Sequence, residues 1–140
     1  MMNNVLIVAA RVALGLMFTV FGLNGFLHFI PNPPSIPPVA MAFFGAMVQS
    51  HFSAFVFGVQ LICGVLLLIN RFVLLALVVL AAVIANIIAF HVTMWPASLI
   101  PMPVIATLLW FAVAWPLRDR LIPLLEVKVR ADQLAPRRFS

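Results

Sequence analysis

The chain has 140 residues and a formal net charge of +5, and 66% of its residues are hydrophobic while only 8% are charged. An average soluble domain is roughly half apolar and about a quarter charged. This composition therefore excludes that class and indicates a protein surrounded by lipid. Disorder is excluded too, because it requires low hydrophobicity. The single cysteine, Cys63, excludes a disulfide framework.

Apolar runs predict four membrane-spanning helices in one domain, residues 1–117. A spanning helix needs about 20 predominantly apolar residues, and the predicted spans cover residues 9–30, 52–69, 72–95 and 100–117. The fourth run is short, but its two early prolines suit a first helical turn, and Pro116 permits a kink near its end. The predicted fold class is an all-α integral membrane four-helix bundle.

The first external loop, between the first two spans, is expected to hold a short helix. Residues 31–38 are rich in proline, which removes backbone donors and biases the preceding residues away from the helical region. Residues 39–49 are helical in composition but too few to cross a bilayer. We therefore expect an interfacial helix that partly roofs the bundle.

Basic residues are concentrated in the segment that follows the last apolar run. This segment holds six of the eight Lys and Arg residues. By the positive-inside rule both termini face the cytoplasm, and residues 118–140 form a basic cytoplasmic tail. Arg11, Arg71, Arg118 and Arg120 are expected to anchor the helices at the inner interface. No basic run with interleaved aromatic residues supports a nucleic-acid partner.

Polar side chains within the predicted spans are the candidate functional groups, because they are costly in hydrocarbon. Helical spacing places Asn24 and His28 on one face of the first span, and Gln60 lies near the bilayer middle in the second. We expect a ligand pocket in the outer half of the bundle. Its candidate residues are Asn24, His28, Gln60, Asn86 and His91. The alternative is that these groups bond across helix interfaces and only stabilise packing.

Small residues predict close helix approach at two places. Gly64 follows Gln60 by one helical turn, and Ala81, Ala85 and Ala89 form a stripe along the third span. Small side chains let membrane helices pack closely.

No catalytic or metal-binding constellation is visible. All three carboxylates lie beyond the last span, so they cannot pair with the histidines on the opposite side of the membrane. The three histidines lack metal-ligand spacing and an acidic partner, so no metal site is predicted. Cys63 lies in apolar surroundings without a basic neighbour and is expected to be unreactive.

Several segments together resemble the DoxX family of small bacterial membrane proteins over nearly the whole chain. They are Arg-Val-Ala-Leu-Gly-Leu-Met-Phe at 11–18, the stretch from 21 to 31, Gly-Val-Leu-Leu-Leu-Ile-Asn-Arg-Phe at 64–72, Asn-Ile-Ile-Ala-Phe-His at 86–91, Leu-Ile-Pro at 99–101 and Trp-Pro-Leu-Arg-Asp at 115–119. The resemblance implies a four-helix bundle in the bacterial cytoplasmic membrane.

Most members of that family have no assigned reaction, and some are associated with quinone-linked sulfur oxidation or with membrane redox complexes. The resemblance therefore implies a redox-associated membrane subunit that holds a quinone or similar lipophilic ligand and works with a membrane or soluble redox partner. The family usually has a Glu where this chain has Gln60, which removes a protonatable group but keeps a donor for a carbonyl. A structural or assembly subunit without ligand is the alternative, and a small-solute transporter is a third hypothesis.

Overall fold

The computed structural model describes residues 3–125, and every regular element within them is a helix. The predicted all-helical fold is therefore confirmed for this part of the chain, while the predicted tail lies outside it from residue 126 onward. The α-helices are α1 (Asn4–Leu27), α2 (Pro38–Gln49), α3 (Phe52–Leu68), α4 (Val73–Met94), α5 (Met102–Ala114) and α6 (Arg118–Leu121). Short 3-10 segments are Pro96–Ser98, Trp115–Leu117 and Ile122–Leu125.

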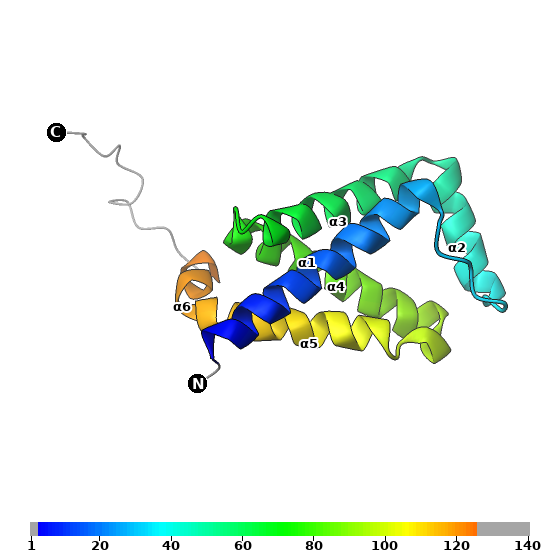
Figure 1. The fold of residues 1–140 in the computed structure, drawn as a ribbon. Coiled ribbons are helices and arrows are strands. Elements are labelled where there is room, and N and C mark those ends of the chain that lie inside the picture. The colour runs from blue at the N-terminus through cyan, green and yellow to red at the C-terminus, as the bar shows by residue number, and fades with distance from the viewer. Residues whose placement is uncertain (1–2, 126–140) are drawn as a thin grey trace, which may run out of the picture.

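Four helices enclose a common interior. α1 packs against α3 and α5, and α4 packs against the same two helices. Figure 1 shows that α1 and α3 diverge from α4 and α5 along the molecule, from the end that holds α6 toward the end that holds α2. We call these the core end and the α2 end.

Two of the helices have the length and apolar character needed to cross a membrane. They are α1, with 24 residues, and α4, with 22. The helices α2 and α3 are bent by 89° at their junction and would add a third crossing if they formed one span. The predicted short helix is present as α2, and the kink expected at Pro116 coincides with the change from α5 to a 3-10 turn.

The first helix differs from its prediction at both ends. It begins at Asn4 because the side chain of Asn3 accepts a hydrogen bond from the backbone N–H of Val5 at 3.4 Å. It ends at Leu27 because His28 adopts a left-handed conformation, with φ of 52°. The expectation that Asn24 and His28 share a helix face is therefore wrong.

Backbone contact between α1 and α3 depends on glycine. A Cβ atom on Gly22 would lie 2.6 Å from the backbone nitrogen of Leu61, and one on Gly64 would lie 2.5 Å from the backbone nitrogen of Thr19. The close approach predicted at Gly64 is thus confirmed. No side chain fits at these two positions without separating the helices.

The alanine stripe of α4 does not make the contact that was expected of it. Ala85 and Ala89 are exposed, because α4 turns a bulkier face toward its neighbours. The buried residues of α4 are Ala76, Leu77, Leu80 and Ile84.

The core end is held by apolar packing and by two hydrogen bonds from side chains to the backbone of another helix. Arg11 of α1 donates to the carbonyl of Leu67, in the last turn of α3. Trp110 of α5 donates from Nε1 to the carbonyl of Leu77 of α4, at 2.8 Å. A cation suits the C-terminal end of a helix, where carbonyls lack partners. Arg11 is thus an interhelical contact.

Replacing Gly22 with alanine should destabilise the protein, because the added methyl group would push α1 away from the backbone of Leu61. We expect thermal unfolding in detergent at a lower temperature, with a loss of about 1 to 3 kcal/mol, as for other overpacked sites. Gly45→Ala is the matched control, because nothing lies within 4 Å of a Cβ atom there. Equal melting temperatures for the two variants would contradict the close contact.

Candidate functional site

Gln60 is the only buried polar side chain among residues 3–125, with 7% of its surface exposed. It lies on the face of α3 that also carries Cys63, Gly64 and Leu67. These four are the buried residues of α3, and Gln60 is the one nearest the α2 end. No residue of α3 between Gln60 and the α2 end is buried.

The amide of Gln60 makes no hydrogen bond with any residue that the structure describes. An amide has two donor hydrogens and an acceptor oxygen. Among the described residues, the fully enclosed side-chain atom without a partner is Thr19 Oγ1, so the amide atoms of Gln60 keep some accessible surface. A ligand atom that reaches this amide can accept a hydrogen bond from it. Gln60 is therefore the centre of the candidate site.

Thr19 is a second interior polar group that the sequence analysis missed. Its Oγ1 is enclosed without a hydrogen-bond partner. The other two threonines bond to their own helices, Thr93 to the carbonyl of Ala89 at 2.7 Å and Thr107 to that of Pro103 at 2.8 Å. The hydroxyl of Thr19 instead packs where Gly64 has no side chain. The spacing of Thr19 one turn after Gly15 was the signal that could have indicated it.

Both predicted asparagines bond to the backbone of their own segments. The Oδ1 of Asn24 accepts from the backbone N–H of Ile30 at 2.7 Å, which holds the chain as it leaves α1. Asn86 is exposed, and its Nδ2 donates to the carbonyl of Ala82 at 2.9 Å. Neither amide is left without a bond, in contrast to Gln60.

The two predicted histidines differ in their surroundings. His28 is exposed at the end of α1. His91 is partly buried, and its Nδ1 lies 2.7 Å from the carbonyl of Ile87. Because a carbonyl only accepts, Nδ1 carries the proton in this contact, and Nε2 of a neutral ring is left as an acceptor.

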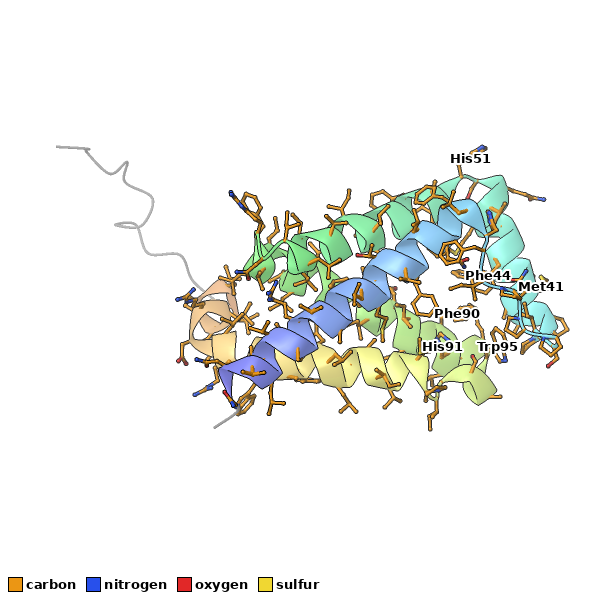
Figure 2. All side chains as sticks on the ribbon, viewed as in Figure 1. Met41, Phe44, His51, Phe90, His91 and Trp95 are labelled. Atoms are coloured by element: carbon orange, nitrogen blue, oxygen red, sulfur yellow. The ribbon has the colours of Figure 1, made fainter. Side chains whose placement is uncertain are left out.

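Aromatic side chains gather where α2 meets α4. The ring centroid of Phe90 lies 5.6 Å from that of Phe43 and 5.1 Å from that of Phe44, and His91 contacts Phe90 edge to face at 5.2 Å. Figure 2 shows Phe44 of α2 and Phe90 of α4 pointing toward each other between these helices. We call Phe43, Phe44 and Phe90 the aromatic cluster.

The structure does not join the five predicted residues into one hydrogen-bonded layer. In the described ranges of the chain, no hydrogen bond links any two of them. A groove of about 220 Å³ lies elsewhere, between α4 and the start of α5, and its lining is apolar. It is lined by Ile88, Leu99, Pro103, Val104, Thr107 and Leu108. A shared pocket therefore stays a prediction, and Gln60 is its buried member without a hydrogen bond to a described residue.

The four predicted anchor arginines belong to segments at the core end. Arg71 lies in the turn between α3 and α4, and α6 carries the other two exposed arginines beside the start of α1 (Figure 1). Arg118 donates a hydrogen bond to the backbone carbonyl of Trp115 at 3.1 Å, and its guanidinium lies 5.3 Å from the centre of the Trp115 ring. Arg118 also lies 3.8 Å from the carboxylate of Asp119. Positive charge is thus gathered away from Gln60.

The chemistry that these residues support is binding through hydrogen bonds. Residues 3–125 contain no group of three or more His, Cys, Asp or Glu that could hold a metal ion. No family model, curated protein or solved structure matches the chain. Its function is therefore inferred from Gln60 and the residues around it.

Replacing Gln60 with methionine should leave the stability of the ligand-free protein unchanged or raise it, because the lost amide has no partner. Asn24→Leu should lower stability by about 0.5 to 1.5 kcal/mol, because the backbone N–H of Ile30 loses its acceptor. Thermal unfolding in detergent after exchange of bound lipid measures both. A large loss for Gln60→Met would show that the amide has a partner within the protein.

Proposed function

We propose that the chain is a four-helix membrane protein of the DoxX type that holds a lipophilic ligand with a carbonyl head group, such as a quinone. The observation that carries the proposal is Gln60, a polar residue only 7% exposed whose amide makes no hydrogen bond with a described residue and is not fully enclosed. In this role Gln60 donates a hydrogen bond to the ligand carbonyl. The redox chemistry belongs to a partner, and this chain binds and orients the ligand.

The exposed surface of the helices supports a place in the lipid bilayer. Leu16, Ile62 and Leu108 are examples of large apolar side chains that are at least half exposed, and a soluble protein rarely exposes so many. The segment from α5 through α6 is nearly continuous helix from residue 102 to 121, which gives the fourth helix about the length of a span. These features favour four crossings of a lipid bilayer.

The surroundings of Gln60 support a ligand that is apolar apart from its carbonyl groups. Cys63 lies on the same face of α3 toward the core end, and the aromatic cluster lies toward the α2 end. A few hydrogen-bonding groups in an apolar site are typical of sites for lipophilic cofactors. An amide, unlike a carboxylate, keeps its donor at every physiological pH, so binding at Gln60 needs no proton uptake.

A structural or assembly subunit without a ligand is the second candidate. Asn24 and Asn86 support it, because their amides already bond to the backbone of their own segments. In this case Gln60 would gain its partner from another subunit or from packing changes in the assembled complex. The two candidates differ in whether purified protein retains a ligand.

Lipid extraction of the purified protein tests the ligand directly. We expect wild-type protein in mild detergent to retain a quinone near one molecule per chain, measured by mass spectrometry. Gln60→Met should lower that amount several-fold, since a hydrogen bond is worth about 1 kcal/mol. Asn86→Leu is the control and should leave it unchanged, because Asn86 is exposed and bonds to its own helix. Wild-type protein without quinone would contradict the proposal and favour the structural subunit.

Reporter fusions test the proposed topology. Fusions after Ile69 and after Ser140 should report the cytoplasm, because the arginines lie in the adjoining segments. A fusion after Ser35 should report the opposite side. A reporter in the periplasm after Ile69 would overturn the orientation.

A further inference from the structure

We infer that α2 is a hinged lid over the interior at the α2 end, held shut by the aromatic cluster. The inference concerns how the interior is closed, and it can be tested without any ligand. That the lid admits a ligand to Gln60 rests on the proposed function.

The helices that flank Gln60 do not bury side chains at the α2 end. On α3, none of residues 52–59 is buried, and on α4 none of residues 85–94 is buried. On α1 the last buried residue is Gly22. The divergence of α1 and α3 from α4 and α5 accounts for this pattern (Figure 1). α5, by contrast, buries Pro103 and Ala106 near its start, at this end. Closure on the side of α3 and α4 therefore depends on what α2 adds.

The contact surface between α2 and the rest of the protein is small and apolar. Ala40 is its one buried residue. Phe43 and Phe44 contact Phe90 of α4 across the end of the interior, with ring centroids 5.6 and 5.1 Å apart (Figure 2). Among residues 3–125, no side-chain hydrogen bond ties α2 to α1, α4 or α5. Three rings thus form the main latch between α2 and α4.

Both connections of α2 allow it to swing. Residues 28–37, which precede it, form no helix, and the first helical turn of α2 has no side-chain cap. After α2, the chain turns by 89° within two residues, where His51 has a φ of 61°. A change of backbone angle at Ser50 and His51 would move α2 as a unit without disturbing α3.

The single cysteine of the chain provides a built-in probe of lid opening. Cys63 is 5% exposed and lies one helical turn from Gln60, on the same face of α3. Because its side chain is almost fully covered, a membrane-permeant maleimide should react with its thiol slowly until the interior opens. The rate of Cys63 alkylation by N-ethylmaleimide, followed by intact-protein mass spectrometry, therefore reports the opening of the lid.

Phe90→Ala should raise the alkylation rate of Cys63 by at least about fivefold, because it removes both aromatic pairs of the latch. Phe44→Ala should raise it as well, and the double variant should add little to Phe90→Ala, since both changes break one latch. Phe55→Ala is the matched control, because Phe55 is on α3 itself and 65% exposed. Its rate should equal that of wild-type protein.

All rates are measured well below the melting temperature of each variant. Equal rates for Phe90→Ala and Phe55→Ala would overturn the lid, and so would a rise that merely follows the loss of thermal stability across the set. Faster alkylation in a protein that retains no quinone would support the lid while contradicting the proposed function. If wild-type protein retains quinone but Phe90→Ala does not raise the alkylation rate of Cys63, the lid is contradicted while the proposed function is supported.

Discussion

The contact between the backbones of α1 and α3 is the constraint on which the rest of the structure depends. Gly22 and Gly64 let the two helices touch without intervening side chains. In lipid, where apolar association of helices has little driving force, such close packing is a main source of stability. With α1 and α3 joined in this way, α4 and α5 complete the four walls of the interior. The element that we infer to move, α2, lies at one end of it.

The site follows from where this packing stops. Apolar side chains fill the core end, and Gln60 is the first residue of α3 that they cover. The amide of Gln60 makes no hydrogen bond with a described residue, in contrast to that of Asn24, whose oxygen accepts from the backbone N–H of Ile30 after α1. Gln60 and Asn24 are both amides within apolar runs of the sequence, and they differ in the structure because of their positions relative to the core.

Hydropathy predicted the helical fold and the short α2 well, because the length of an apolar run depends on composition alone. The residue at which α1 ends could not be predicted from hydropathy, because His28 takes a left-handed conformation that residue type does not dictate. The alanine stripe of α4 was misleading for a related reason. Small residues permit close approach, but which face turns inward depends on Leu77 and Leu80 filling the core. Thr19 was missed for the same reason, because its hydroxyl is enclosed without a hydrogen-bond partner only through the contact of α1 with Gly64.

The bond from Arg11 to the carbonyl of Leu67 has a consequence for biogenesis. The two residues are 56 positions apart in the chain, so the first helix is synthesised with a cation whose partner emerges only with α3. In the proposed membrane topology, that guanidinium would stay near the headgroups until α3 supplies its acceptor. α3 also brings, through Gly64, the surface against which α1 packs.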